Sequence, residues 1–273
     1  MSDDGINLVR RRDVLGILTM GSLSLAGDSS AGSTYTGGQQ PLEAGPKTIG
    51  VLGGLGPQAT MHLEARVHRV AQRLIPQREN SGYPPMVVYY HRHPPILLND
   101  DSSPRLPIQP DPRLLDAARR LGSWVDFLVI ASNGAHLIQE QIEQAAGRTV
   151  LSMIRVTLDE VQRRGWRTVG VLGFGNPMVY TTPLASLKLA YETLDDARRG
   201  VLDREIMKVM EGRDTAESPD IAREAVASLR ARKVDGIILG CTEIPLLLGT
   251  TTDADLIDPL ELLAEAAVKL AMV

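Results

Sequence analysis

The sequence predicts an α/β protein of two pseudo-symmetric lobes, each a parallel sheet flanked by helices, with the functional site in the cleft between them. Two duplicated segments carry this prediction. Residues 48–57 (TIGVLGGLGP) return as residues 168–177 (TVGVLGFGNP). Residues 125–136 (VDFLVIASNGAH) return as residues 234–245 (VDGIILGCTEIP). Each copy is a short apolar run that stops at a turn, which is typical of a buried parallel strand before a loop.

Helical patterns fill the spaces between these strands. Residues 86–90 add one further apolar strand. Apolar residues at helical spacing predict helices at residues 59–74, 112–121, 137–146, 157–164, 219–232 and 260–272. Strands that alternate with helices indicate parallel sheets covered on both faces. Ligands bind beyond the carboxyl ends of such strands, so the turns that follow the repeated strands should face each other.

The boundaries of the lobes follow from a change of composition. Residues 1–26 hold three consecutive arginines before an apolar stretch too short to span a bilayer, which is typical of a twin-arginine-type signal segment. Residues 27–46 are rich in Gly, Ser and Thr and are predicted to be a flexible linker. We assign residues 47–155 to the first lobe, with residues 255–273 packing back on it, and residues 156–254 to the second. Export through the leader is expected; the alternative is a cytoplasmic protein with an upstream extension or a misplaced start codon.

Charge and composition exclude several partners. The 273 residues carry a net charge of −4, with both signs interspersed, and aromatic residues make up 4%. A chain without a basic stripe or a stacking platform is not expected to bind nucleic acid, and no membrane insertion of the mature chain is expected. The single cysteine excludes an internal disulfide, so it is left as a free thiol for chemistry or for packing.

The duplicated turns place two different side chains at the same point. Cys241, the only cysteine, aligns with Ser132. A cysteine at the end of a strand that opens a helix lies where backbone N–H groups and the helix dipole favour the thiolate, and Thr242 can cap that helix or donate to an anion. Asn133 and Gly134 offer a side-chain amide and backbone donors in the first lobe, which suits a small carboxylate between the two turns. A helix cap at Ser132 and a plain turn at Asn133 are the structural alternatives.

Three motifs resemble those of the aspartate/glutamate racemase superfamily. Residues 53–60 (GGLGPQAT) are similar to its Gly-Gly-Met-Gly-Pro-Glu-Ala-Thr, residues 132–136 (SNGAH) to its Cys-Asn-Thr-Ala-His, and residues 240–243 (GCTE) to its Gly-Cys-Thr-Glu. The resemblance covers residues 47–273. It implies a cofactor-independent enzyme without pyridoxal phosphate or metal, a homodimer, and an amino acid or other small carboxylate as substrate. In such enzymes one cysteine removes the α-proton as thiolate and the other protonates the opposite face.

Candidate site residues follow from these turns and from the resemblance. We place Cys241 and Ser132 in catalysis, and His136 and Glu243 in support of them. Candidates for substrate binding are Asn133, Gly134, Thr242, Gly54 and Arg92. Arg92 stands between two histidines after the strand at residues 86–90 and would hold a distal carboxylate; a solvated loop is the alternative. His136 either supports Ser132 or forms a structural hydrogen bond.

Three positions depart from the family pattern. Ser132 replaces the first catalytic cysteine, Pro177 stands where a carboxylate-binding threonine is usual, and Leu263 stands where a histidine is usual. A thiol, with a reference pKa of about 8.5, becomes a base near neutral pH with modest help, which a serine hydroxyl does not. The chain is therefore predicted to perform one-sided proton chemistry with Cys241 as the competent group. The changes at Pro177 and Leu263 leave the substrate open.

Three functions remain open from the sequence. The leading one is a racemase-family isomerase that acts on an acidic amino acid or a related small carboxylate. The second is a lyase resembling the single-cysteine arylmalonate decarboxylases of the same superfamily, which need only one acid. The third is a non-catalytic protein that binds small carboxylates in the same cleft.

Overall fold

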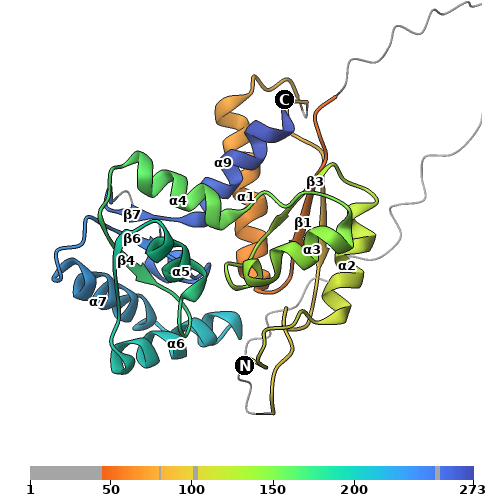
Figure 1. Ribbon diagram of the computed structural model, residues 1–273. Helices are drawn as coiled ribbons and strands as arrows, with labels where there is room; N and C mark the ends of the chain where they lie inside the picture. The colour runs from red at the N-terminus through yellow and green to blue at the C-terminus, as the bar shows by residue number, and fades with distance from the viewer. Residues whose placement is uncertain (1–44, 80, 101–103, 250–252) are drawn as a thin grey trace, which may run out of the picture. The chain divides into compact units, whose positions relative to one another are not determined.

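Two parallel sheets form the centre of the structure and confirm the predicted α/β class (Figure 1). The computed structural model describes residues 45–79, 81–100, 104–249 and 253–273. The predicted signal segment and all but the end of the predicted linker therefore lie outside the described residues. None of the helices in the described part of the chain is both long and apolar enough to cross a membrane.

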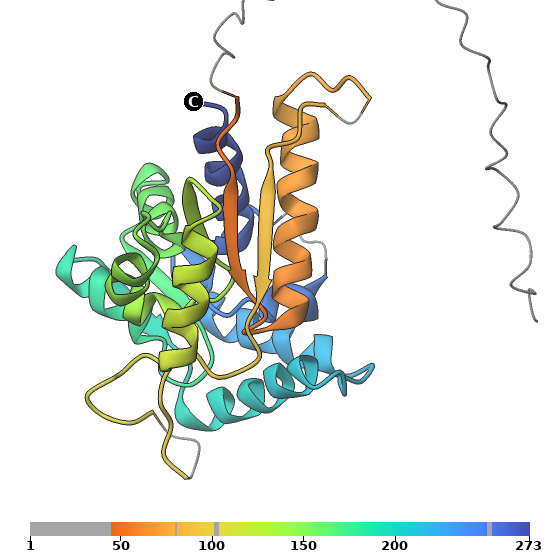
Figure 2. The ribbon, with the colours of Figure 1, turned by 90° about the vertical axis from the view of Figure 1, so that its right-hand side faces the viewer.

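The first sheet has three strands in the order β2–β1–β3. These strands are β1 (Ile49–Gly53), β2 (Met86–Tyr90) and β3 (Phe127–Ile130). The helices that cover the sheet are α1 (Pro57–Leu74), α2 (Pro112–Gly122), α3 (Gln139–Ala146) and α9 (Pro259–Ala271). Because successive strand residues point to opposite faces, Ile49 and Val51 pack against α1 and α9, whereas Leu52 packs against α2 and α3. Figure 2 shows α1 and α2 on opposite sides of this sheet.

The second sheet has four strands in the order β5–β4–β6–β7. These are β4 (Thr168–Leu172), β5 (Ala190–Thr193), β6 (Gly236–Leu239) and β7 (Leu256–Ile257). Its helices are α4 (Met153–Arg163), α5 (Met178–Ser186), α6 (Asp196–Met210), α7 (Ser218–Arg230) and α8 (Ile244–Leu248). Val171 and Ile238 pack against α4 and α5, whereas Leu172 and Leu239 pack against α6, α7 and α8.

The two sheets repeat one topology. In each, the first strand along the chain (β1 or β4) lies between the second (β2 or β5) and the third (β3 or β6), and all of these pairs are parallel. The predicted pseudo-symmetry is therefore present in the order of the strands. It places Ser132, which follows β3, and Cys241, which follows β6, at equivalent positions of the two lobes.

The last helix, α9, crosses back from the second sheet to the first. It packs along α1 and α4. Arg66 on α1 pairs with Asp258, which caps the start of α9, at 2.6 Å. The backbone N–H of Lys47 donates to the carbonyl of Ala271 at 2.7 Å. The first and last residues of the folded region are thus joined beside β1.

The sequence patterns did not predict α5, α6, β5 or β7. Helix α5 contains Pro183, which breaks the usual helical signal. Helix α6 buries Glu205 between apolar residues, so it lacks a clean apolar stripe. The strand β7 is only two residues long. These elements form because tertiary packing, rather than local periodicity, supplies their stability.

Candidate active site

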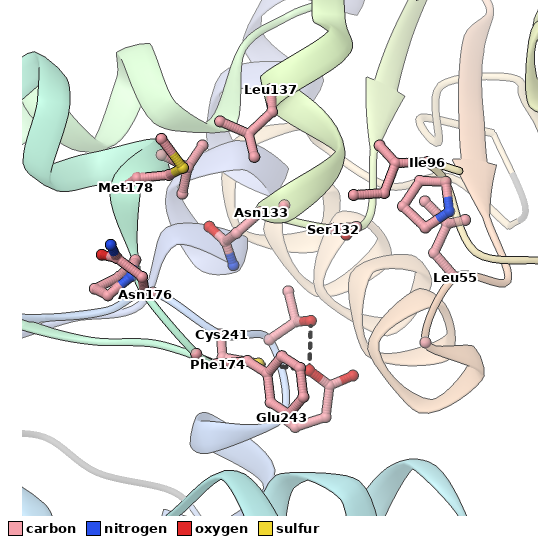
Figure 3. Close-up of a pocket in the computed structure, with 18 of the residues that line it drawn as sticks. Leu55, Ile96, Ser132, Asn133, Leu137, Phe174, Asn176, Met178, Cys241 and Glu243 are labelled. Atoms are coloured by element: carbon pink, nitrogen blue, oxygen red, sulfur yellow. Dashed lines mark hydrogen bonds between the residues drawn. The ribbon is translucent and has the colours of Figure 1, made fainter. Parts of the chain in front are cut away.

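A pocket of about 510 Å³ lies where the turns after β1, β3, β4 and β6 meet (Figure 3). These turns contribute Gly56, Ser132, Asn176 and Cys241 to its lining. They follow the carboxyl ends of parallel strands, which is where a ligand site was expected. Both lobes therefore line one pocket, and the serine and the cysteine of the duplicated turns lie in it together.

The thiol of Cys241 donates a hydrogen bond to the carboxylate of Glu243 inside this pocket. The Sγ atom lies 3.0 Å from Glu243 Oε2, and the hydroxyl of Thr242 donates to the same oxygen at 2.9 Å. Glu243 is only 3% exposed. A side chain at Gly56, the N-cap residue of α1, would collide with the other carboxylate oxygen, Oε1. The carboxylate is thus held beside the thiol by a hydroxyl of its own turn and by the close approach of the first lobe.

The backbone around Cys241 depends on the glycine before it. The N–H of Gly240 donates to the carbonyl of Leu172 at 2.6 Å, and a Cβ at Gly240 would stand 2.7 Å from that oxygen. Only glycine lets the chain leave β6 so close to β4. The following helix, α8, begins at Ile244 and is five residues long. The thiol therefore lies ahead of a short helix rather than in its first turn.

The pKa of Cys241 is raised, which corrects the expectation of a favoured thiolate. Burial is the largest cause, followed by the charge of the Glu243 carboxylate and the hydrogen bond to it; the carboxylate of Asp203 acts in the same direction. Helix α8 is too short and begins too late to outweigh these effects. The thiol is consequently protonated at neutral pH, with the Glu243 carboxylate as its hydrogen-bond acceptor.

Asn133 presents an unpaired donor to the pocket. Its Oδ1 accepts a hydrogen bond from the hydroxyl of Tyr180 at 2.6 Å, which fixes the amide with Nδ2 on the other side. Asn133 is 4% exposed, and Nδ2 has no partner among the described residues. Figure 3 shows this amide pointing into the cavity. A buried donor left unpaired is costly, so the position suits an oxygen of a bound carboxylate. Sequence reasoning missed Tyr180, because it lies 47 residues away on the unpredicted helix α5.

Ser132 lines the pocket, while His136 holds the backbone of its turn. The Nδ1 atom of His136 lies 2.8 Å from the carbonyl oxygen of Ser132, and its Nε2 accepts the N–H of Met153 at 3.1 Å. A carbonyl only accepts and an N–H only donates, so the ring is neutral with its proton on Nδ1. Burial lowers the pKa of His136 to about 4, which keeps the ring neutral. The ring therefore positions the turn, and the Ser132 hydroxyl has no hydrogen bond within the described residues. Gly134 lines the pocket beside it, at the start of the 3-10 helix Gly134–Ile138.

Three residues singled out from the sequence lie outside the pocket. Arg92 lines a separate, shallow hollow beside Arg113, although Ile96 of the same loop lines the pocket. Gly54 has a φ of +79°, its N–H donates to Thr60 Oγ1 at 2.8 Å, and a side chain there would meet the backbone of His91. Its role is therefore structural. Leu263 is fully buried in the core of the first lobe, so the change at this position does not alter the pocket wall.

The pocket is apolar except for a few side chains near the thiol. Among the described residues that line it, Cys241 and Glu243 are the only ionisable ones, and Lys, Arg and His are absent. Pro177 lies in the wall at the N-cap of α5, where it offers no hydroxyl. No group of three or more His, Cys, Asp or Glu side chains gathers within the described ranges in a way that could hold a metal ion.

The fold is that of a two-lobed α/β protein whose lobes share one pocket. A sequence model of the family described as Asp/Glu/Hydantoin racemase matches residues 52–267. The chain therefore belongs to the Asp/Glu/hydantoin racemase family, as the three motifs predicted. Membership of this family supports an isomerase-type enzyme.

Known proteins share parts of the sequence and the fold. The broad specificity amino-acid racemase RacX of Bacillus subtilis (strain 168) is 28% identical over 131 residues, which are 46% of this chain and 53% of RacX. The match thus spans about half the length of this curated relative. An aspartate racemase of Picrophilus torridus has a TM-score of 0.67 at 22% identity, over 82% of this chain and 94% of that chain. An aspartate racemase homologue from Pyrococcus horikoshii OT3 has a TM-score of 0.63 at 22% identity, over 82% and 99%. At this level of identity the structural likeness establishes a common fold.

Proposed function

We propose that this protein is a cofactor-independent amino-acid racemase or epimerase that removes and returns the α-proton of a small carboxylate, with Cys241 as its main acid and base. The observation that carries the proposal is the 3.0 Å contact between Cys241 Sγ and Glu243 Oε2 in a pocket that both lobes line. A thiol beside a carboxylate can lose and regain its proton, as α-proton exchange requires. Family membership supports the same class of reaction.

The proton transfers balance with groups present in the pocket. Glu243 takes the thiol proton, and the thiolate of Cys241 then takes the proton from the α-carbon. The electron pair of the broken C–H bond moves onto the substrate carboxylate. The unpaired Nδ2 of Asn133 is available to donate to that carboxylate as its charge grows. Return of the proton from Cys241 restores the starting enantiomer, and protonation of the opposite face gives the other one.

Ser132 is the proposed donor on the opposite face, directly or through a water molecule. The proton that Glu243 took from the thiol then passes through solvent to the Ser132 oxygen, which restores the starting state of all three side chains. It lines the pocket from the first lobe, at the position equivalent to that of Cys241. Its hydroxyl is much less acidic than a thiol, so it can return a proton to a carbanion but is a poor group to remove one. The protein should therefore exchange the α-proton of one enantiomer faster than that of the other.

Exchange of the α-proton in deuterium oxide, followed by NMR from each enantiomer of a panel of amino acids, tests the proposal. We expect Cys241→Ala to lower exchange by about 10²–10⁴, and Ser132→Cys to bring the rates of the two enantiomers closer together. Ser123→Cys, on an exposed turn, is the matched control that adds a thiol outside the pocket. Full exchange by Cys241→Ala would exclude acid–base catalysis by this residue. Equal, fast exchange from both enantiomers by the natural protein would contradict the one-sided scheme.

A lyase is the second candidate, and the protonated state of Cys241 favours it. A thiol whose pKa is raised by burial and by Glu243 is a ready proton donor for the carbanion left when carbon dioxide departs. Such a reaction needs one acid, and the chain has one cysteine. Release of carbon dioxide from 2-substituted malonates, with one solvent deuterium in the product, would identify a lyase. A non-catalytic binding protein would give neither exchange nor carbon dioxide.

A further inference from the structure

We infer that the substrate of this site carries an apolar side chain on its α-carbon, with no carboxylate in that side chain. The inference rests on the proposed function only for the identity of the reacting α-carbon. The choice between an apolar and an acidic side chain rests on the walls of the pocket, which can be tested without turnover.

Apolar side chains from both lobes form these walls. Leu55 and Ile96 come from the first lobe, and Phe174, Met178 and Met207 come from the second. Figure 3 shows Leu55 and Ile96 on one side of the cavity and Met178 on the other. Phe174 is 49% exposed and Met178 is 42% exposed. Apolar surface of this size, concentrated in a concave site, is the surface that an apolar ligand would cover.

The charges of the pocket oppose an acidic side chain. Among the described lining residues no Lys, Arg or His is present, and Glu243 already places a negative charge beside the thiol. Arg92, which was expected to hold a distal carboxylate, lines a different hollow. A second carboxylate would therefore lose its hydration without gaining a cation.

Leucine and aspartate form a matched pair for this question. Their side chains have the same branched arrangement of heavy atoms, with two methyl groups in leucine where aspartate has two carboxylate oxygens. Burial of the two methyl groups favours leucine by roughly tenfold. An unpaired carboxylate in the same place is expected to disfavour aspartate by about a further tenfold or more. We therefore expect the site to bind leucine at least about a hundredfold more tightly than aspartate.

Protection of Cys241 from alkylation measures this binding directly. It is the only cysteine, so the mass of the intact protein after iodoacetamide treatment reports this site alone. Both enantiomers of leucine and of aspartate are titrated at mildly alkaline pH. 4-Methylpentanoate, which is leucine without its amino group, shows whether the site recognises an amino acid or a plain carboxylate. Exchange of the α-proton is measured on the same compounds.

A cation placed in the wall should reverse part of the preference. Met178→Lys adds a positive charge to an exposed part of the lining. We expect it to lower the ratio of aspartate to leucine dissociation constants at least about tenfold, because the added ammonium pairs with the second carboxylate. Met61→Lys is the matched control, since Met61 is 53% exposed on α1 and does not line the pocket. It should leave both dissociation constants unchanged.

Each outcome decides the inference. Protection by leucine or 4-methylpentanoate at about a hundredth of the aspartate concentration, with the shift in Met178→Lys, supports it. Equal protection by aspartate, or no protection by either apolar acid at their solubility limits, overturns it. If leucine protects but none of the compounds exchanges its α-proton, the selectivity of the site stands and the proposed isomerase activity fails. If aspartate protects and exchanges, the activity stands and the selectivity fails.

Discussion

Replacement of Glu243 by glutamine should separate two effects that its carboxylate has on Cys241. The substitution keeps the size of the side chain but removes its charge. A thiolate and a carboxylate at the observed 3.0 Å repel each other by about 1.4 kcal/mol even when screened as in water. Without this repulsion the pKa of the thiol falls, and thiolate reactions at neutral pH should accelerate at least about tenfold. The variant also loses the group that accepts the thiol proton, so α-proton exchange should fall by about 10²–10⁴.

Two assays on the same preparation follow these opposite changes. The rate of alkylation by iodoacetamide, measured against pH by intact mass, reports the thiolate of the single cysteine. Deuterium incorporation reports catalysis. Glu224→Gln, on the exposed side of α7, is the matched control and should change neither rate. An alkylation rate at or below that of the natural protein would refute the electrostatic account of Cys241, and unchanged exchange would remove Glu243 as the base.

Four further predictions follow from the same structure. Gly56→Ala should slow exchange about tenfold or more with little change in melting temperature, because the added methyl collides with the flexible end of Glu243; a large drop in melting temperature with normal exchange would contradict this. His136 has a folded pKa of about 4, so the unfolded chain binds its proton first as pH falls. About 3 kcal/mol of the free energy of unfolding should therefore be lost between pH of about 6.5 and that value. Urea unfolding of the natural protein and of His136→Asn tests this, and a difference between their free energies of unfolding that does not change with pH would refute it. The pH dependence that Cys241 gives to stability has the opposite sign, because its pKa is raised on folding. Its contribution to the free energy of unfolding is full below the unfolded thiol pKa of about 8.5 and is lost as pH rises through the folded pKa. Urea unfolding at alkaline pH should show this loss in the natural protein and not in Cys241→Ala. Removal of residues 1–46 should leave the melting temperature and the proposed dimer unchanged by calorimetry and light scattering, while cell fractionation of the full chain tests export through the leader.

The duplicated segments of the sequence predicted the fold and the centre of the site. The repeated runs became β1, β3, β4 and β6, and parallel strands end at a common edge. This is why Cys241, Ser132 and Asn133 could be placed in one pocket from the sequence. The continuous apolar run at residues 49–53 likewise predicted a buried strand, and β1 is buried along its whole length.

The electrostatics of the site could not be derived in the same way. Whether the side chain of Glu243 turns back toward Cys241 depends on the space that Gly56 leaves, and that residue lies far away in the sequence. The donor at Asn133 depends on Tyr180, a buried residue that belongs to no motif. Arg92 lies outside the pocket although Ile96 of the same loop lines it, because a local pattern does not show which residues of a loop turn toward the site. Motifs locate side chains along the chain, whereas charge and orientation arise from contacts between distant segments.

Helix α9 makes the first lobe a discontinuous folding unit, because it follows the second sheet in the sequence but packs on α1 and β1. During synthesis α9 emerges after all the other described elements, so the faces of α1 and β1 that it covers stay open until it is made, whereas the second sheet has all its strands once Ile257 is made. The second lobe is therefore able to close first. A circular permutant that links Ala271 to Lys47 and opens the chain at the exposed Gly147, between α3 and α4, would turn both lobes into contiguous segments. In that chain α9 would be made before β1 and α1, so the faces that it covers would no longer stay open while the rest of the chain is made.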